Sequence, residues 1–396
     1  MHTALVGDHD AAPPLLPALG AALPAAVAIV GAVGISLAAA QAIGLSDRAT
    51  ASWLLVQFGL PGALGVALTR VWRQPLLFIP NTTGIVLLGS LGGELSYPEL
   101  VGATGVAGLV VLLASALGLT ARLGALVPAP VVFGVIAGAV LPFVVALFDA
   151  LDAVPVVVGG MMFAYVLGRR AGHPRLPPIA LVLGAGLVLA GLTDRLAGPS
   201  RAWTLPVLDP IRPALSLEAV ATVVPVLVPL IVLQANLAAV VFLRAQGFRP
   251  PARSIDAVSG AATAAAAAGL GAVPVSLAGF VTPLIAGPEA GDVRGRYRAA
   301  YASGAVMIAV AVAAPLAAEV PAMVPPALLA ALVGLAMLGV LGQALGEVGR
   351  TRAQLGPLVA FAAAASGLEL LGLGPIFWAL VLGVATTFVL DRRSAT

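Results

Sequence analysis

Long stretches without a charged residue dominate the chain and restrict the folds open to it. Residues 100–118, 219–243 and 299–318 contain no Asp, Glu, Lys or Arg, and each approaches the ~20 residues that a helix needs to cross a bilayer. Of all residues 60% are hydrophobic and 9% are charged, whereas soluble domains are roughly a quarter charged. The sequence therefore predicts an all-α polytopic membrane protein whose partner is the lipid bilayer.

The same residues argue against several other classes. The chain contains no cysteine, and we find no phosphate-binding loop, metal cluster or nucleophile–base pair, so we expect no enzyme activity, no metal and no cofactor. The net charge of +3 is explained by Arg in loops, so no nucleic-acid partner is expected. Residues 1–16 lack the basic region of a signal peptide and are interpreted as an N-terminal tail.

Apolar runs and helix breakers divide the chain into fourteen expected transmembrane segments. A first repeat of seven spans covers residues 17–193, an extracytoplasmic connection covers 194–216, and a second repeat of seven spans covers 217–391. The expected spans are 17–43, 50–70, 75–92, 100–118, 126–148, 153–169 and 177–193, then 219–245, 254–270, 271–287, 297–318, 320–344, 355–372 and 374–390.

The distribution of Arg supports this count. All twenty basic residues are Arg, and cytoplasmic loops of membrane proteins carry the excess of positive charge. With a cytoplasmic N-terminus, only Arg48, Arg195, Arg201 and Arg212 fall outside, and the acidic connections at Glu94, Asp149 and Glu319 also fall outside. We therefore expect a multi-pass protein of the bacterial inner membrane with both termini in the cytoplasm.

Two of the spans contain strong helix breakers. Pro75 and Pro80 precede Asn81, Thr82 and Thr83, so the chain is expected to run extended up to a capped half-helix. A second breaker, residues 271–279, lies in the corresponding span of the other half. Because seven is odd, the second repeat is inverted relative to the first, as in secondary transporters, which bind substrate at such paired breaks. Segments 3 and 10 are thus predicted to be broken and to contain short extended stretches.

Candidate binding residues lie at these breaks and on span 8. The starts of the half-helices favour an anion, and Gln234 and Asn236 are amides at membrane depth. Such amides are also common as interhelical hydrogen-bonding groups, and the two interpretations stay open. Phe78 and Phe280 could flank an aromatic ring or only pack. The predicted substrate-binding set is Asn81, Thr82, Thr83, Gln234, Asn236, Ser276, Leu277, Ala278, Gly279, Phe280 and Phe78.

No ionisable residue is placed in the membrane core by this reading. Asp256, Glu289 and Glu369 all lie close to expected span ends. Intramembrane acids are the usual carriers of coupling protons, but these three are interpreted as interface residues in contact with water. The route of a coupling proton is therefore left unassigned.

Three stretches carry a resemblance to a known family: residues 233–238 (LQANLA), then Pro288, Glu289 and Ala290, and 365–368 (ASGL) with 372–378 (GLGPIFW). On these motifs the sequence resembles the benzoate membrane transport protein family, and the resemblance extends over nearly the whole chain. The family is similar in fold to nucleobase/ascorbate transporters and sulfate permeases. This resemblance implies a core domain (17–118 with 219–318), a gate domain (126–193 with 320–390) and substrate held between the half-helices of spans 3 and 10.

The resemblance implies a secondary active transporter that imports benzoate or a similar small aromatic carboxylate together with protons, by alternating access. Nucleobase carriers of this fold use carboxylates on spans 8 and 10, where this chain has amides and residues 276–279, which disfavours a nucleobase. A carrier for another organic anion or nucleobase-like ring, and an anion channel of the same fold, remain the alternatives. A homodimer is among the assemblies that the sequence allows.

Overall fold

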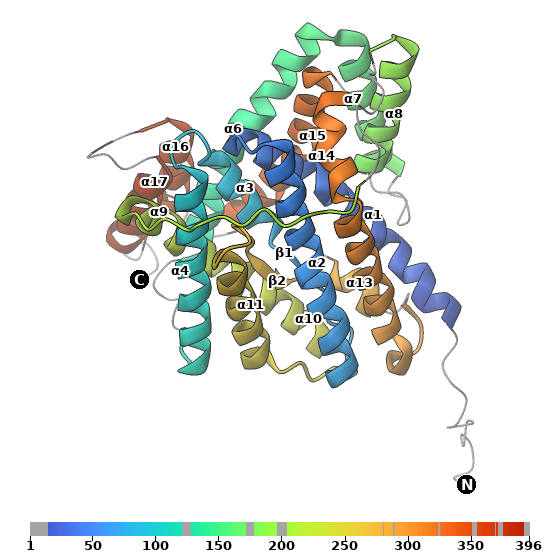
Figure 1. Cartoon of the computed structure of the whole chain (residues 1–396). Helices are drawn as coiled ribbons and strands as arrows, with labels where there is room; N and C mark the ends of the chain where they lie inside the picture. Colours follow the sequence, from blue (N-terminus) through green and yellow to red (C-terminus); the bar gives the residue numbers. More distant parts are fainter. Residues whose placement is uncertain are drawn as a thin grey trace.

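The computed structural model describes residues 15–120, 128–171, 178–195, 204–279, 281–287, 290–323, 325–350, 355–368, 370 and 375–391, and these are mostly helical (Figure 1). The helices of the first half are α1 (Leu15–Ile43), α2 (Asp47–Trp72), α3 (Thr82–Ser90), α4 (Tyr97–Ala116), α6 (Ala129–Ala153), α7 (Pro155–Ala171) and α8 (Pro178–Leu192). Those of the second half are α9 (Leu217–Pro229), α10 (Ala238–Ala245), α11 (Ala252–Ala267), α12 (Thr282–Ala286), α13 (Tyr297–Val312), α14 (Ala314–Met323), α15 (Pro326–Gly349), α16 (Leu355–Ala365) and α17 (Pro375–Thr386). Shorter elements are the π-helices η1 (Leu230–Leu237) and η4 (Thr387–Asp391), the 3₁₀-helix η3 (Val293–Gly295) and the strands β1 (Phe78–Pro80) and β2 (Val275–Leu277).

Membrane-spanning length is clear for part of the bundle. Among the described residues, 5 helices are long and apolar enough to cross a bilayer, including the continuous run Leu217–Arg244 through α9, η1 and α10. The half-helices α3 and α12 have 9 and 5 residues, too few to cross alone. The exact number of fourteen spans therefore stays a prediction.

The predicted breaks in segments 3 and 10 are confirmed. β1 and β2 pair antiparallel, with Phe78 opposite Leu277 and Pro80 opposite Val275. Asn81 N donates to Pro274 O at 2.7 Å and Ala278 N donates to Leu77 O at 2.9 Å, which extends the pairing at both ends. Pro75 and Pro80 have no N–H for a helical bond, so this stretch satisfies its backbone across the pair of strands instead.

Gly271 turns the chain into β2. Its φ of +130° lies in a region that side chains disfavour, and a Cβ there would lie 2.6 Å from the Tyr97 hydroxyl oxygen. Beside it, Trp53 Nε1 donates to Ala272 O at 2.9 Å. Residues from α2 and α4 therefore fix where the second broken segment enters the core.

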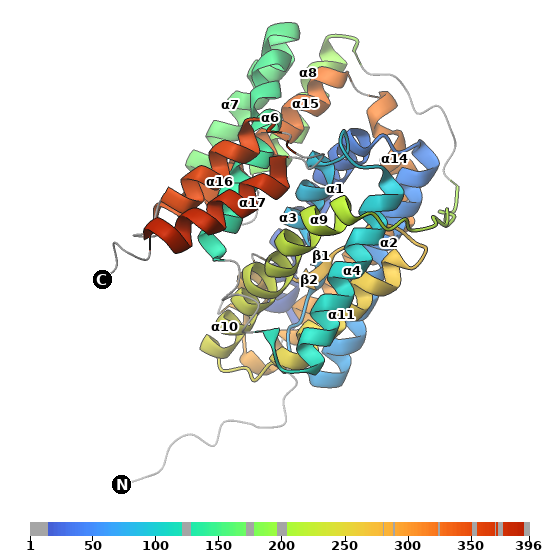
Figure 2. The ribbon, with the colours of Figure 1, turned by 90° about the vertical axis from the view of Figure 1, so that its left-hand side faces the viewer.

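The helices form two groups, seen side by side in Figure 2. One group contains α6, α7, α8, α15, α16 and α17, and the other contains α1 to α4 and α9 to α14. Contacts recur between corresponding elements of the two halves: α4 packs on α11 as α13 packs on α2, and α6 packs on α15. Such reciprocal pairs are what an inverted repeat requires.

Two predicted boundaries differ from the structure. Span 297–318 and a connection at Glu319 were expected, but the helix ends at Val312 and α14 carries Glu319 within it. Pro315 has no N–H to donate to the preceding turn, which interrupts the helix at Ala313. Because α14 packs against α2, the group that includes the broken segments extends to Met323 rather than ending at residue 318. At the other end, α1 begins at Leu15, inside the predicted tail 1–16.

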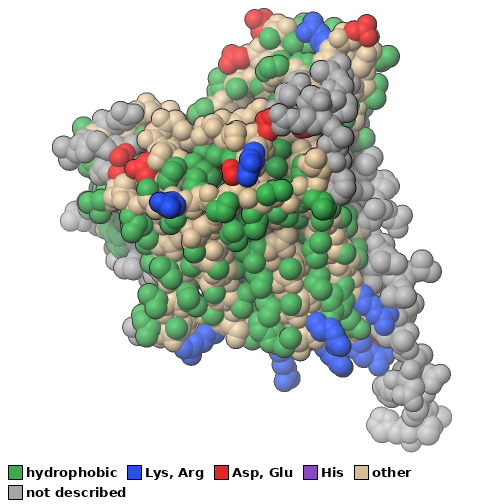
Figure 3. All heavy atoms as spheres, in the orientation of Figure 1, with side chains coloured by type: hydrophobic (Ala, Val, Ile, Leu, Met, Phe, Trp, Pro, Cys, Tyr) green, Lys and Arg blue, Asp and Glu red, His purple; other side chains and the backbone are tan. Residues whose placement is uncertain are grey.

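Charge separates to the two ends of the bundle, and apolar side chains cover its flank (Figure 3). We call one end the arginine end; it carries Arg70, Arg73, Arg244, Arg249, Arg253, Arg294 and Arg298. The opposite, acidic end carries Asp47, Glu94, Glu99, Asp209, Glu218 and Glu319, together with a few arginines such as Arg48. Large apolar residues in the middle of their helices, such as Leu109 of α4 and Phe163 of α7, are exposed, as expected for a surface that faces lipid.

Candidate functional site

The π-helix η1 lies at the centre of the candidate site. Its 8 residues interrupt the long helix between α9 and α10 and include Gln234 and Asn236. Pro225 and Pro229 just before it remove two backbone donors from the helix. Wider π-turns are rare and occur frequently at functional sites. The break places the two amides in different surroundings.

Asn236 is engaged in hydrogen bonds within the protein. It is 1% exposed, and its Nδ2 donates to Asp256 Oδ1 at 2.9 Å and to Ser259 Oγ at 3.1 Å. Its Oδ1 accepts from Leu277 N of β2 at 2.8 Å. These contacts join η1, α11 and β2, which is the interhelical role that the sequence left open for this amide.

Asn81 and Ser276 join the two broken segments. Asn81 Oδ1 accepts from Gly84 N at 2.8 Å and so caps α3, as predicted. Its Nδ2 donates to Ser276 Oγ at 3.1 Å and to Leu230 O at 3.3 Å. Both side chains are buried, so in this conformation they hold the crossing point rather than face open space.

Gln234 is the predicted polar residue that lines the larger cavity of the site, and it contacts Thr83 at the start of α3. Gln234 is partly buried, and its Nε2 donates to Thr83 Oγ1 at 3.4 Å. It lines a cavity of about 400 Å³ between η1 and the helices α6 and α15. Thr82 and Thr83 are the first residues of α3, so their N–H groups have no carbonyl of their own helix to reach. The start of α3, with these two N–H groups, therefore lies next to Gln234.

The other predicted residues surround the crossing without lining this cavity. Phe78, Leu277 and Ala278 are fully buried, which fits packing for Phe78. Thr82 lines a separate hollow of about 50 Å³ beside α1, too small for a typical ligand site. A Cβ on Gly279 would lie 3.4 Å from Ala235 Cα and Gln234 O, so its backbone rests against η1. Phe280 lies outside the described residues.

Of the residues that line this cavity, the sequence predicted only Gln234, and the aromatic and polar ones that it missed lie in the second helix group. Phe133 comes from α6, and Gln343 and Glu347 come from the last turns of α15. Glu347 also pairs with Arg350 at 2.7 Å, near the arginine end. These residues lie inside long apolar helices, and the only sequence feature that could have singled them out is that polar residues are rare in such helices. Asp256, expected to contact water, is 8% exposed and is joined to Asn236.

Arg296 fixes the far end of the half-helix α12. Its guanidinium donates to Ala286 O at 2.7 Å and to Gln246 Oε1 at 3.1 Å, and its Nε donates to Gly291 O at 2.9 Å. A cation at a helix C-terminus interacts favourably with the terminal carbonyls. In the neighbouring loop, the pKa of Asp292 is held below its ordinary value, first by the N–H of Arg294 and then by its guanidinium.

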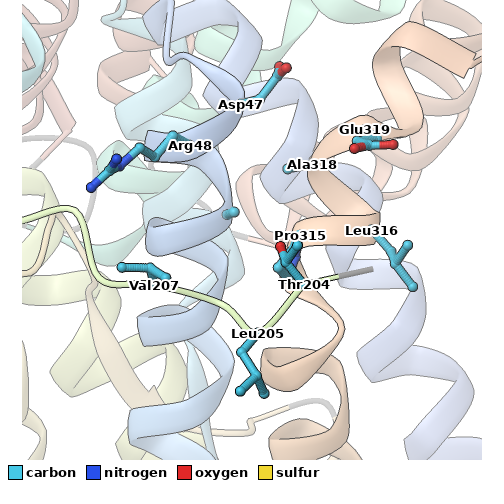
Figure 4. A pocket seen from close by; sticks show the side chains of 10 residues that line it. Asp47, Arg48, Thr204, Leu205, Val207, Pro315, Leu316, Ala318 and Glu319 are labelled. Atoms are coloured by element: carbon cyan, nitrogen blue, oxygen red, sulfur yellow. The ribbon is translucent and has the colours of Figure 1, made fainter. Parts of the chain in front are cut away.

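A second cavity, of about 280 Å³, lies at the acidic end (Figure 4). It is lined by the start of α2, the chain around Leu205 and the helix α14, which presents Glu319. Arg48 and Asp209 form an exposed ion pair beside it, at 3.1 Å. Exposed pairs contribute little stability, so this end offers a surface hollow rather than a buried binding site.

Apolar helices in a multi-pass bundle, two broken segments that cross inside it and a cavity beside the crossing define a membrane transporter. The chain matches the family described as benzoate membrane transport protein over residues 12–389. It therefore belongs to that family, which is a family of membrane transporters and not of enzymes.

Similar proteins cover nearly the whole chain. A benzoate membrane transport protein of Acinetobacter baylyi is 26% identical over 368 residues, which are 92% of this chain and 93% of the relative. The inner membrane protein YdcO of Escherichia coli is also 26% identical, over 90% of this chain and 92% of its own.

Solved structures share the fold. The transmembrane domain of the cyanobacterial bicarbonate transporter BicA matches with a TM-score of 0.57 at 15% identity, over 94% of this chain and 98% of that domain. Murine Slc26a9, an anion transporter in the inward-facing state, matches with a TM-score of 0.61 at 12% identity, over 98% of this chain and 69% of its own.

Proposed function

We propose that this protein imports benzoate or a similar small aromatic carboxylate, together with a proton, across the bacterial inner membrane. The observation that carries the proposal is the cavity beside Gln234 and the start of α3. Its volume of about 400 Å³ lies in the range of small-molecule sites. The family membership and the relative from Acinetobacter baylyi support benzoate as the substrate.

The lining suits an aromatic ring with one anionic end. Val132, Phe133, Leu230 and Leu233 offer apolar contacts for the ring. The Gln234 amide and the first N–H groups of α3 are the donors for the carboxylate, since a helix N-terminus favours an anion. No cation among the described residues lines the cavity, and the acid that lines it, Glu347, pairs with Arg350. The carboxylate of the substrate would therefore be held by dipoles, and weak holding permits release.

Alternating access is proposed to move one helix group against the other. The core domain would comprise α1 to α4 and α9 to α14, and the gate domain α6 to α8 and α15 to α17. The cavity lies between η1 of the first group and α6 and α15 of the second, where relative movement would open and close it. With fourteen spans in two inverted repeats of seven, each helix group would contain corresponding spans from both repeats.

The arginine end is proposed to face the cytoplasm, with both termini on that side. Glu347 and Gln343 line the cavity at the end of α15 that leads to Arg350, so the cavity would be reached from the cytoplasm in this conformation. An anion that enters against a negative-inside potential loses about 2.3 kcal/mol per charge per 100 mV. Entry with one proton removes that electrical penalty, which is the reason to propose symport.

Uptake of radiolabelled benzoate into proteoliposomes tests the proposal. When the outside is made more acidic, we expect saturable uptake that raises the benzoate concentration inside the proteoliposomes above that outside. We expect no such accumulation when a protonophore collapses the pH gradient. Protein-free liposomes give the background for diffusion of benzoic acid. Saturable accumulation of another anion but not of benzoate would move the assignment to that substrate. Flux that never saturates and ignores the pH gradient would instead indicate an anion channel.

A further inference from the structure

Asp256 is a buried acid that the proposed binding site does not use. It lies in the second turn of α11 and is 8% exposed. Its Oδ1 accepts from Asn236 Nδ2 at 2.9 Å, and its carboxylate also accepts from the Thr120 hydroxyl. Ionisable residues inside a membrane bundle are expensive to bury and mark ion or proton pathways. Asp256 is therefore a candidate for more than packing.

No described cation pairs with this carboxylate. Arg253, on the preceding turn, donates instead to Ser115 O and Ala116 O at the end of α4. Of the elements packed on α11, β2 and η1 carry no ionisable residue, and α4 carries Tyr97 and Glu99 only at its opposite end. α2 carries Asp47 and Arg48 at the acidic end and Arg70 in its last turn, without an ion pair to Asp256. A proton is thus the available neutralising charge.

Asn236 connects this acid to the substrate cavity. The same amide that donates to Asp256 accepts from Leu277 N of β2 at 2.8 Å. Two residues before it on η1, Gln234 lines the cavity. A hydrogen bond to an ionised carboxylate is roughly twice as strong as one between neutral groups. Protonation of Asp256 would therefore loosen the bond that holds η1 in place beside the cavity.

We infer that Asp256 is the proton-binding site of this transporter and that Asn236 couples it to substrate binding at Gln234. The step is one proton added to the carboxylate to give a neutral carboxylic acid, and its release on the cytoplasmic side restores the anion. The inference rests on the proposed function for the substrate, but the protonation of Asp256 is a property of the protein alone.

Asp256→Asn in proteoliposomes separates transport from coupling. The amide has the shape of the protonated acid and keeps an oxygen that can accept from Asn236. We expect benzoate exchange between the two sides of the membrane to be retained and accumulation driven by a pH gradient to be lost. Asp292→Asn, which changes an exposed loop acid, is the matched control and keeps both activities. Gradient-driven accumulation by Asp256→Asn would overturn the inference.

Ser259→Ala distinguishes a proton site from a structural acid. It removes another hydrogen-bond partner of Asn236 but leaves the carboxylate. A proton site predicts that Ser259→Ala still couples benzoate uptake to the pH gradient, whereas Asp256→Asn does not. Equal loss of coupling in both variants would show that coupling needs only the intact hydrogen bonds of Asn236 with Asp256 and Ser259. That result would contradict a proton-binding role for Asp256.

Infrared spectroscopy of the purified protein provides a test without substrate. As the pH is lowered, we expect a carboxyl C=O band that is absent in Asp256→Asn and shifted in Asp256→Glu. If Asp256→Asn does not fold, the shift in Asp256→Glu alone decides. Absence of any band that responds to these changes would refute the proton site. If the band is found but the parent protein transports no benzoate, the proposed substrate fails while the proton site stands.

Discussion

The Nδ2 atom of Asn81 lies 3.1 Å from the Oγ atom of Ser276, so a hydrogen bond between two side chains joins the two halves of the protein where their broken segments cross. The antiparallel pairing of β1 with β2 runs directly beside it. In a bilayer, unpaired backbone at this depth would be strongly unfavourable. The crossing is therefore the fixed frame on which the start of α3 and the cavity are positioned.

Replacing Asn81 should destabilise the protein more than removing an ordinary helix cap. Asn81→Ala removes the cap of α3 and leaves the buried Ser276 hydroxyl without its donor, and a lost cap alone costs about 1 kcal/mol. Ser46→Ala removes the exposed cap of α2, whose Oγ accepts from Ala49 N, and is the matched control. Thermal unfolding in detergent should show the larger decrease in Tm for Asn81→Ala. Equal decreases would mean that the crossing adds nothing beyond the cap.

The two amides of η1 should separate binding from stability. Gln234→Ala should weaken benzoate binding with little change in Tm, because Gln234 makes only a 3.4 Å contact with Thr83. Asn236→Ala should lower stability by about 1–3 kcal/mol, since Leu277 N and Asp256 lose a buried partner. Isothermal titration and thermal unfolding of both variants measure the difference. A stable Asn236→Ala that no longer binds benzoate would return Asn236 to the binding site.

The features of the fold and the candidate site that depend on local sequence were predictable, and those that depend on contacts between distant residues were not. The breaks at Pro80 and at residues 271–274 are local chemistry, because proline lacks a donor wherever it lies, and both were predicted. The division of roles between Gln234 and Asn236 was not predictable. It depends on η1, which turns one amide to the cavity and the other to α11. A π-turn has no distinct sequence pattern beyond the two prolines before it.

Long-range contacts account for the other differences. Asp256 lies near a span end in the sequence, so exposure to water was the reasonable expectation, but α4, η1 and Thr120 cover it. Phe133 and Gln343 meet at the cavity only because α6 packs on α15. These contacts join residues that are far apart in the chain. A single sequence shows which residue types are present but not which of them come into contact.

A negative charge at the start of α3 should compete with the substrate. In Thr83→Asp the new carboxylate would accept from the first N–H groups of α3 and repel an anion near Gln234, by several kcal/mol where solvent screens poorly. Thr193→Asp places the same charge at the exposed end of α8 and serves as control. We expect benzoate affinity to fall strongly in the first variant only. Unchanged affinity in a folded Thr83→Asp would remove α3 from the binding site.

Cysteine labelling should establish which end faces the cytoplasm. The chain has no cysteine, so the parent protein gives no background. Leu205→Cys lies on the exposed chain at the acidic end, and Arg249→Cys lies on the exposed loop at the arginine end. With a membrane-impermeant maleimide on intact cells, we expect labelling of Leu205→Cys and protection of Arg249→Cys until the membrane is opened. The reverse pattern would place the cavity mouth outside.

Side-chain size at Gly279 should control transport through η1. A Cβ at this position would meet Ala235 Cα and Gln234 O at 3.4 Å, an ordinary contact, so Gly279→Ala should fold and transport benzoate. In Gly279→Leu the further carbons would extend from a Cβ that already contacts η1, so we expect them to displace η1 and to move Gln234 away from Thr83. We therefore expect Gly279→Leu to lose benzoate affinity while Gly279→Ala retains it, measured by titration of each purified protein. For comparison, a Cβ in Gly84→Ala would lie 2.7 Å from Leu227 Cδ1 and 3.1 Å from Pro274 Cγ, so the Leu227 side chain must shift and we expect a decrease in Tm. Normal affinity in Gly279→Leu would show that the position of η1 does not set the geometry of the site.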